Sequence, residues 1–270
     1  MDLFDIRNKI AVITGGTGTL GFSLLEYLLK KGVKIALLSR SYEKAHGLIK
    51  PFINDDLPIK IYQVDVFSQT ELKSTATKII EKFKRVDFLI NAVGGNIDGA
   101  TIPLGKSIFD LNEKAFDKVV ELNLKGTILP TLVFAEQMTK QKSGSVVNFS
   151  SLSVSRVMTR VVGYSAAKAA MENFTRSMAV EMALSFGDQV RINAIAPGVF
   201  LANQNRSLLV NADGSYTERG KLIIDNTPMK RFGLPHELHG AVHFLCCEAS
   251  KFVTGIVLPI DGGINIFSGV

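Results

Sequence analysis

The chain has 270 residues, 46% of them hydrophobic, and a formal net charge of +6, which fits one large α/β domain spanning residues 1–270. Its apolar stretches are shorter than the roughly 18 residues that cross a bilayer, and its basic residues are spread out without the interleaved aromatic residues of a nucleic-acid binder. The N-terminus lacks the basic and apolar segments of a signal peptide. We therefore expect a cytoplasmic protein that binds neither membrane nor nucleic acid.

Seven short runs rich in apolar and β-branched residues mark the candidate strands, at residues 9–14, 33–39, 59–65, 86–91, 144–150, 190–196 and 255–261. Amphipathic helical patterns lie between them, for example at 70–83 and 113–138. This alternation predicts right-handed βαβ units. The expected fold class is α/β, a single doubly wound Rossmann domain with a seven-stranded, mainly parallel sheet and helices on both faces.

Two long irregular stretches interrupt the alternation, at residues 94–112 and 197–220. Each follows a predicted strand, so each leaves the carboxyl edge of the sheet, where open α/β sheets bind ligands. Loops of this length in a compact domain are usually functional. We expect them to form the substrate loops, the second reaching to about residue 225.

A glycine-rich turn, TGGTGTLG at 14–21, joins the first strand to a helical pattern. Gly16, Gly18 and Gly21 satisfy G-x-G-x-x-G, which lets the backbone approach a pyrophosphate at a helix N-terminus. The turn thus predicts a dinucleotide cofactor. Its expected contacts here are Gly15, Thr17, Gly18, Thr19, Leu20 and Gly21.

The second strand ends at Ser39 and Arg40, where an NAD-binding chain would place a carboxylate about 20 residues beyond the glycines. A hydroxyl and a guanidinium suit a 2′-phosphate better. We therefore predict that NADP(H) is preferred and that NAD(H) remains possible. The alternative is that Arg40 is a surface residue at a strand end.

The segment YSAAKAA, residues 164–170, opens a predicted helix and puts Tyr164 and Lys168 four residues apart on one face. A cation beside a phenol lowers the tyrosine pKa, so that the phenol becomes a usable acid or base. Ser150 and Ser151 end the strand before this helix, and Asn123 lies in the preceding helical stretch. These groups can converge over a nicotinamide.

Together the motifs resemble the short-chain dehydrogenase/reductase family over nearly the whole chain. The matching segments are TGGTGTLG, Asp65-Val66, NAVGG from Asn91, Asn123, Ser150-Ser151, YSAAK, Pro197-Gly198 and TGIVLPIDGG. Two positions depart from the family pattern: Thr19 stands where the family has glycine, and Ala92 replaces an asparagine.

The resemblance implies a catalytic group. Ser151, 13 residues before Tyr164, would bind the substrate oxygen. Tyr164 would donate a proton to that oxygen as hydride reaches the carbon. Lys168 would hold the nicotinamide ribose, and Asn123 a water in a proton relay.

The same resemblance implies further cofactor contacts. Asp65 and Val66 would contact adenine, and the strand end from Asn91 would lie on the adenosine ribose side. The full set of these expected contacts is Asp65, Val66, Asn91, Ala92, Val93, Gly94, Tyr164, Lys168, Pro197, Gly198 and Val199, the last three bordering the nicotinamide.

The loops have a narrower resemblance, to the short-chain branch of D-mannonate oxidoreductases, also called fructuronate reductases. It is carried by NAVGGN, TRVVGYSAAK, APGVFLANQNRSLL, NADGSYTERG and the terminal FSGV. This resemblance implies a sugar-acid substrate, D-fructuronate or D-mannonate.

The polar residues of the loops agree with an anionic substrate that carries several hydroxyls. Amides suit hydroxyls, and an arginine fork suits a carboxylate. Arg160 is the first candidate for the carboxylate and Arg206 the second; either could instead be a surface or interface arginine. The expected substrate contacts are Gly95, Asn96, Ser151, Arg160, Asn205 and Arg206, with Asn203 and Gln204 in the same amide-rich run.

Two other hypotheses stay open. One is another reductase of the family, such as one that acts on 3-oxoacyl carrier-protein thioesters. The other is a non-catalytic nucleotide sensor on the same fold, which would need no proton donor. The family resemblance also suggests a homotetramer.

The remaining candidate ligands have structural explanations. His236, His239 and His243 have helical spacing without a cysteine or carboxylate constellation, so we expect no metal site. Cys246 and Cys247 are adjacent in an apolar stretch and are expected to be buried, reduced thiols.

Overall fold

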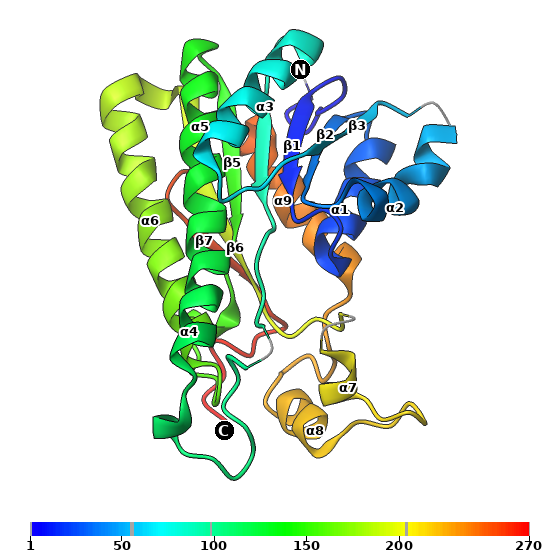
Figure 1. Ribbon diagram of the computed structural model, residues 1–270, viewed down its shortest axis with the longest axis vertical. Coiled ribbons are helices and arrows are strands. Elements are labelled where there is room, and N and C mark those ends of the chain that lie inside the picture. The colour runs from blue at the N-terminus through cyan, green and yellow to red at the C-terminus, as the bar shows by residue number, and fades with distance from the viewer. Residues whose placement is uncertain (1, 55–56, 98, 203–204, 270) are drawn as a thin grey trace.

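The computed structural model describes residues 2–54, 57–97, 99–202 and 205–269 (Figure 1). Within these residues, seven parallel strands form one sheet in the order β3-β2-β1-β4-β5-β6-β7. The strands are β1 (Ile10–Thr14), β2 (Lys34–Ser39), β3 (Ile59–Gln63), β4 (Phe88–Asn91), β5 (Gly144–Phe149), β6 (Val190–Pro197) and β7 (Val257–Ile260). Each lies within one residue of a predicted run or inside it, which confirms the α/β fold class.

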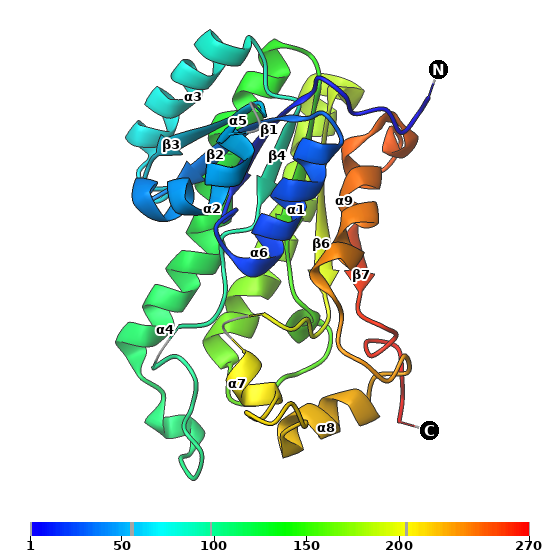
Figure 2. The same ribbon diagram turned by 90° about the vertical axis from the view of Figure 1, so that its right-hand side faces the viewer.

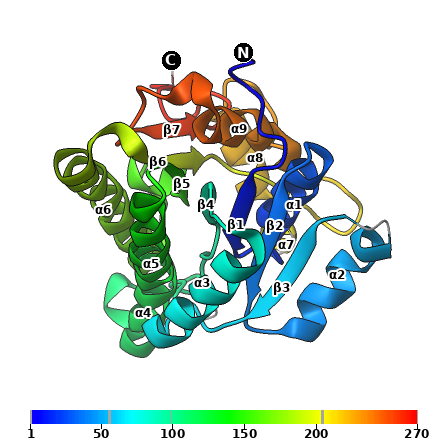
Figure 3. The ribbon, with the colours of Figure 1, turned by 90° about the horizontal axis from the view of Figure 1, so that it is seen from above.

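Helices cover both faces of the sheet, as Figure 3 shows from above. The α-helices are α1 (Thr19–Lys30), α2 (Tyr42–Asn54), α3 (Gln69–Phe83), α4 (Glu113–Val120), α5 (Gly126–Lys140), α6 (Val162–Phe186), α7 (Arg206–Leu209), α8 (Glu218–Asp225) and α9 (His239–Cys246). The short helical turns are η1 (Ile108–Asp110), η2 (Glu121–Lys125), η3 (Leu152–Val154), η4 (Gly187–Gln189), η5 (Pro235–Leu238) and η6 (Glu248–Ser250).

Two apolar clusters pack the helices onto the sheet. On one face, α1 contributes Leu24, Leu25 and Leu28, fully buried together with residues of α2 and α9. On the other face, α3, α5 and α6 pack together, for example through Ile79 and Phe134. Both faces of the central strands are therefore covered, which explains why those segments are nearly continuous apolar runs, whereas the edge strands β3 and β7 are partly exposed.

The sheet order places the ligand edge. Strands β2 and β3 are added to the sheet on one side of β1, whereas β4 to β7 are added on the other, so the order of the strands reverses between β1 and β4. The carboxyl ends at such a switch point leave a crevice. The long loop after β4 and the segment with α7 and α8 both lie at this end of the sheet (Figure 2).

The helical stretch predicted over 113–138 differs from a single regular helix. Its centre, η2, is a π-helical turn between α4 and α5. The Asn123 side-chain amide donates to the Val119 carbonyl at 2.8 Å, the acceptor that an α-helical N–H would use. Competition from this side chain accounts for the wider turn.

The stretch 197–220, predicted to be irregular, contains helical structure. Residues Arg206–Leu209 form α7, and α8 begins at Glu218. The Thr217 hydroxyl caps α8 by accepting the Gly220 N–H at 3.0 Å, and Val210 pairs with Tyr216 in an isolated bridge. Local capping and turn contacts therefore order this loop.

Candidate active site

The glycine turn fits closely against the end of β4. Gly15 has a φ of +70°, a conformation that favours glycine. A Cβ on Gly15 would lie 2.3 Å from the Ala92 carbonyl carbon, and one on Gly21 would lie 2.4 Å from the Gly15 oxygen. Gly15 and Gly21 thus have no room for a side chain, which lets the turn pack closely between the end of β4 and the start of α1.

The surface of this turn suits a pyrophosphate. Gly18 is the N-cap residue of α1 and adds no side chain there, while Thr17, Thr19 and Leu20 are partly exposed beside it. The first turn of α1 carries no acidic residue, so the positive end of the helix dipole is not opposed locally. The residues present therefore fit a dinucleotide cofactor.

Asn91, expected near the adenosine ribose, has a different role for its side chain. The side chain is fully buried and donates to Thr131 and Asn148, both at 2.9 Å, while its oxygen accepts from Thr14. It braces three neighbouring elements of the core. Only the residues after it, Ala92, Val93 and Gly94, are partly exposed toward the site.

The adenosine end of the predicted site is formed by two strand ends. The Ser39 hydroxyl donates to the Ser41 carbonyl at 2.9 Å, which orders the turn after β2, and Arg40 is exposed beside it. After β3, the Asp65 carboxylate accepts the Phe67 N–H at 3.0 Å, and Val66 is buried. These residues thus lie at or just after the carboxyl ends of β2 and β3, and their contact with a cofactor stays a prediction.

At the end of β6, the backbone after Pro197 is fixed by β7. Gly198 donates its N–H to the Ile260 carbonyl at 2.9 Å, and a Cβ there would lie 2.7 Å from the Asp261 α-carbon. Val199 accepts the Gly233 N–H. The turn expected to border the nicotinamide is therefore rigidly positioned.

Tyr164 and Lys168 project from the first turns of α6. The Lys168 ammonium lies 5.8 Å from the centre of the Tyr164 ring. It donates to the Phe149 carbonyl, at the end of β5, at 2.6 Å. This bond ties the start of α6 to the carboxyl edge of the sheet and fixes the pair there.

Burial dominates the titration of both groups. It lowers the pKa of Lys168 to about 8, because a buried ammonium loses hydration. Burial also raises the pKa of Tyr164, and a hydrogen bond with Ser151 opposes that rise. The Tyr164 pKa therefore lies above its ordinary value and not below it as expected, because burial outweighs the groups that favour the phenolate.

The hydroxyls of the two adjacent serines have different hydrogen-bond partners. The Ser150 hydroxyl is buried and donates to Glu172 at 2.6 Å, and Glu172 in turn pairs with Arg176. Ser151 instead lies beside Tyr164 as its hydrogen-bond partner. The geometry therefore supports the choice of Ser151 for the reaction.

Asn123 is fully buried and holds the loop after β4. It accepts the Gly95 N–H and donates to the Gly95 carbonyl, both at 2.9 Å. A Cβ on Gly94 would lie 2.7 Å from Asn123 Oδ1 and 2.9 Å from Lys168 Nζ, so Asn123 and Lys168 line the same small space. Both hydrogens of the Asn123 amide have partners in the protein, which makes this side chain chiefly a positioning group.

The expected substrate residues fall into two groups. Gly95 and Asn96 lie beside the catalytic residues, and the Asn96 amide donates to Thr101 Oγ1. Arg160 is partly buried, with a φ of +74°, and its Nε donates to the Ile102 carbonyl. This bond links the loop after β4 to the segment before α6.

The expected substrate residues of the second loop have no contact with Ser151, Tyr164 or Lys168 among the hydrogen bonds of the described residues. Asn205 accepts the Ala202 N–H and donates to the Phe200 carbonyl, both at 2.9 Å, so its side chain shapes its own loop. Arg206 is exposed at the start of α7. Asn203 and Gln204 lie outside the described residues.

Ser153 is a polar residue of the site that sequence reasoning missed. It is 3% exposed, and its N–H donates to the Ser151 oxygen at 3.2 Å. Its position two residues after Ser151, on the turn between β5 and α6, could have indicated it in the sequence.

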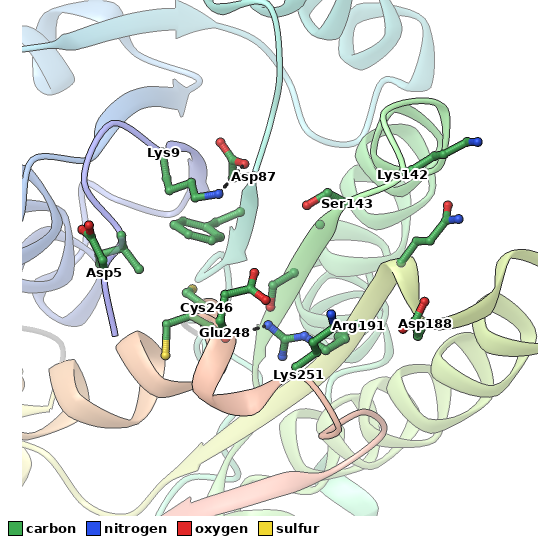
Figure 4. Close-up of a pocket in the computed structure, with 16 residues that line it drawn as sticks. Asp5, Lys9, Asp87, Lys142, Ser143, Asp188, Arg191, Cys246, Glu248 and Lys251 are labelled. Carbon is green, nitrogen blue, oxygen red and sulfur yellow. Dashed lines mark hydrogen bonds and ion pairs between the residues drawn. The ribbon is translucent and has the colours of Figure 1, made fainter. Parts of the chain in front are cut away.

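Two of the cavities bordered by described residues lie at opposite edges of the sheet. One, of about 430 Å³, opens at the carboxyl edge between Val199, Arg231 and Asp261. The other is a crevice of about 180 Å³ at the opposite edge, bordered by Asp87, Arg191 and Glu248 (Figure 4). This second crevice lies where β4 to β6 begin, far along the strands from Ser151.

The histidines and cysteines have structural contacts. His239 stacks on Tyr27, with ring centres 4.4 Å apart, and His243 Nδ1 lies 2.7 Å from the Tyr27 hydroxyl. Cys246 and Cys247 are buried and free. Among the described residues, no cluster of metal-binding side chains and no helix long and apolar enough to cross a membrane are found.

Comparison with protein families connects this geometry to known enzymes. Residues 17–265 match the model of a protein family that is described as enoyl-(acyl carrier protein) reductase. The uncharacterized oxidoreductase UxuB of Bacillus subtilis is 40% identical over 98% of both chains.

Solved structures are similar over the same length. A provisionally named D-mannonate oxidoreductase from Haemophilus influenzae, with bound NAD, has a TM-score of 0.90 at 38% identity and 98% coverage of both chains. A gluconate 5-dehydrogenase from Burkholderia cenocepacia, in complex with NADP and tartrate, has a TM-score of 0.85 at 27% identity and 97% coverage of both chains. The coverage includes both loops at the carboxyl edge.

Proposed function

The chain belongs to the short-chain dehydrogenase/reductase family of NAD(P)-dependent oxidoreductases, and from this premise we propose that its substrate is a small anionic sugar acid. The proposed reaction interconverts D-fructuronate and D-mannonate, a ketone and the corresponding secondary alcohol. The observation that carries this choice is the similarity to the D-mannonate oxidoreductase structure over 98% of both chains.

The protein's own residues account for the proton transfer. The Tyr164 hydroxyl, hydrogen-bonded to Ser151, donates its proton to the carbonyl oxygen during reduction, and the Ser151 hydroxyl binds that oxygen. The Lys168 ammonium, 5.8 Å from the ring centre, stabilises the phenolate that remains. When bound, the nicotinamide cofactor supplies the hydride to the carbonyl carbon in this direction and accepts it in reverse.

Lys168 would be joined by the positive charge of an oxidised nicotinamide when that cofactor is bound. In the reverse direction this charge would help Lys168 to oppose the effect of burial on the Tyr164 pKa. Asn123, through Gly95, would hold the loop after β4 in place for both directions.

For the cofactor, we propose that NADP(H) is preferred and that NAD(H) can replace it. The support is the exposed guanidinium of Arg40 at the end of β2, since the Ser39 hydroxyl beside it already donates to the Ser41 carbonyl. The similar structures divide on this point, one having NAD bound and another NADP.

For the substrate carboxylate, we propose Arg160 first and Arg206 second. The Nε of Arg160 is used by Ile102, so its two terminal nitrogens are the ones that would bind the carboxylate. Gly95, Asn96 and Asn205 complete the proposed substrate contacts.

The decisive experiment follows the oxidation of NADPH and NADH with D-fructuronate, with an acetoacetyl thioester and without substrate. We expect turnover with D-fructuronate, a higher kcat/KM for NADPH than for NADH, and little turnover otherwise. A higher kcat/KM for NADH would refute the cofactor preference alone. Faster reduction of the thioester than of D-fructuronate would refute the substrate assignment.

The thioester is included because one observation favours it. A 3-oxoacyl-(acyl carrier protein) reductase of Thermotoga maritima is 29% identical over 97% of this chain, and the family that matches residues 17–265 is described as enoyl-(acyl carrier protein) reductase. A 3-oxoacyl carrier-protein reductase is therefore the second candidate function. The sensor hypothesis is set aside, because the chain belongs to an oxidoreductase family and keeps Ser151, Tyr164 and Lys168 together.

We further propose a cytoplasmic homotetramer that acts on small molecules without membrane or nucleic-acid partners. Exposed apolar side chains on α5 and α6, including Leu132, Val180 and Leu184, support an assembly.

A further inference from the structure

Among the buried side-chain polar atoms of the described residues that have no hydrogen-bond partner, two lie on the segments that follow β4 and β5, next to the catalytic residues. They are the Ser153 hydroxyl oxygen and the Asn96 side-chain oxygen. Nearly all buried polar atoms in native proteins have a partner, because leaving one unpaired costs free energy. Two such atoms at the edge of an active site therefore point to groups on a ligand.

Ser153 lies on the turn that carries the catalytic serine. Its N–H donates to Ser151 Oγ at 3.2 Å, and Ser151 is hydrogen-bonded to Tyr164. The Ser153 side chain is thus part of the same short turn that presents Ser151 to the substrate, yet its hydroxyl serves no contact inside the protein.

Asn96 lies on the loop after β4, directly after the residue that Asn123 holds. Its nitrogen donates to Thr101 Oγ1, which fixes the amide. The next residue, Ile97, packs on the small apolar cluster that Tyr164 also contacts. The unpaired oxygen therefore belongs to a second segment fixed next to the catalytic tyrosine.

The chemistry of the two atoms limits the ligand group. An amide oxygen only accepts hydrogen bonds, whereas a serine hydroxyl both donates and accepts. A carboxylate cannot donate to Asn96, and a methylene group can serve neither atom. A hydroxyl can satisfy both.

We propose that Ser153 Oγ and Asn96 Oδ1 form a hydroxyl-binding subsite that recognises hydroxyls flanking the reacting carbon of a polyhydroxy substrate. This inference rests on the proposed function, in that Tyr164 and Ser151 bind the reacting oxygen. It adds the residues that distinguish a sugar-derived substrate from an acyl thioester, whose chain beside the carbonyl carries no hydroxyl.

The test compares Ser153→Ala with Ser155→Ala, on the best polyhydroxy substrate and on its monodeoxy analogues. Ser155 is the matched control, because it lies on the same turn and its hydroxyl already donates to the Leu152 carbonyl at 3.3 Å. We expect Ser153→Ala to lower kcat/KM for the parent substrate about tenfold, equivalent to about 1.4 kcal/mol. On the analogue that lacks the bound hydroxyl, Ser153→Ala should lower kcat/KM less than twofold. The reason is that the substitution and the missing substrate hydroxyl remove the same interaction. Ser155→Ala should cost less than twofold on both.

The second arm compares Asn96→Ala with Thr101→Val. Both changes remove the bond between these side chains, but only the first removes Asn96 Oδ1. We expect Asn96→Ala to reduce kcat/KM for the parent at least fivefold more than Thr101→Val does, with the difference lost on one deoxy analogue.

Thermal unfolding provides a readout independent of turnover. Because the Ser153 hydroxyl has no partner in the protein, Ser153→Ala should keep or raise the Tm, while NADPH affinity stays within twofold of wild type. A fall of several degrees would show that the hydroxyl stabilises the fold, and would overturn the proposal.

The remaining outcomes separate the subsite from the substrate. If the wild-type protein ignores D-fructuronate but reduces another polyhydroxy carbonyl compound, and Ser153→Ala shows the tenfold loss there, the named substrate is wrong and the subsite stands. If the Ser153 and Ser155 variants lose equal activity on parent and deoxy substrates, the subsite is refuted. Preference of the wild type for a ketone without hydroxyls also refutes it.

Discussion

At the scale of single residues, backbone groups hold two of the side chains of the site. Lys168 donates to the Phe149 carbonyl, and Ser151 accepts the Ser153 N–H. These bonds fix the two side chains on either side of Tyr164 before any ligand binds. Such preorganisation is a main source of catalytic power, because little reorientation is needed during the reaction.

Replacing Tyr164 by phenylalanine tests the proton donor directly. The ring and its packing remain, so NADPH affinity measured by fluorescence titration should change less than about threefold. Turnover should fall by roughly 10²–10⁴, the usual contribution of a positioned acid. Near-normal kcat in this variant would contradict the role of Tyr164.

At the scale of elements, contacts of α1 with α9 support the start of the cofactor site. Tyr27 and Ser23 of α1 contact His239 and His243 of α9, and α1 begins directly after the glycine turn. The His243 Nε2 atom also donates to the Phe4 carbonyl, which ties down the N-terminal segment. The histidines thus hold the helix whose N-terminus would face the pyrophosphate.

This packing predicts a loss of stability in mild acid. Burial, with smaller contributions from His236 and Lys30, lowers the pKa of His239 from its ordinary 6.5, despite an opposing hydrogen bond with Ser23. The unfolded chain then binds more protons than the folded one below about pH 7, so the free energy of unfolding falls as the pH falls. The stabilisation is fully present above pH 6.5 and is lost as the pH decreases through the folded pKa.

Urea unfolding between pH 7.5 and 5 measures this effect, and His239→Gln is the comparison. Glu237 stays ionised in this range, because its pKa is lowered to about 2, chiefly by its hydrogen bonds with Arg231. The wild-type protein should lose more stability across the range than the variant does. Equal slopes for the two proteins would show that His239 does not carry the effect.

At the scale of the whole molecule, the strand order brings distant segments to one edge. The loop after β4, the turn after β5 and the turn after β6 come from neighbouring strands of the parallel sheet. Their carboxyl ends therefore meet, although Gly94 and Val199 are far apart in the sequence (Figure 2). Helices α5 and α6 lie on one flank of the sheet (Figure 3), and their side chains Leu132, Val180 and Leu184 are exposed.

That surface predicts association. Val180 and Leu184 of α6 are 57% and 79% exposed, so a stable assembly should bury them. Light scattering should give about four times the subunit mass of 29.4 kDa. Replacing both residues by lysine should give smaller species, whereas Ile53→Lys, on the exposed side of α2, should not. A monomeric wild-type protein would exclude the tetramer.

The sequence predicted the strands and the glycine turn well, because both depend on local patterns. Strand residues Ile10–Thr14 are all buried, so their apolar run has no helical period, and Gly15 needs a conformation that few other residues adopt. The π-helical turn at Asn123 and the helices inside 197–225 were not predicted. Both depend on side-chain hydrogen bonds, of Asn123 to Val119 and of Thr217 to Gly220, that residue patterns do not reveal.

The sequence by itself determined the element order, the glycine turn, the catalytic residue types and the family they indicate, because spacing along a helix or at a strand end follows from the backbone alone. Only the tertiary structure decided which side chains face the site. It buried Asn91 in a brace, gave Ser150 to Glu172 and left Ser153 Oγ and Asn96 Oδ1 without partners. The physical reason is that burial and hydrogen bonding depend on segments that folding brings together. At the end of a strand, two neighbouring residues can therefore differ, one lying in the core and the next in the site, as Ser150 and Ser151 do.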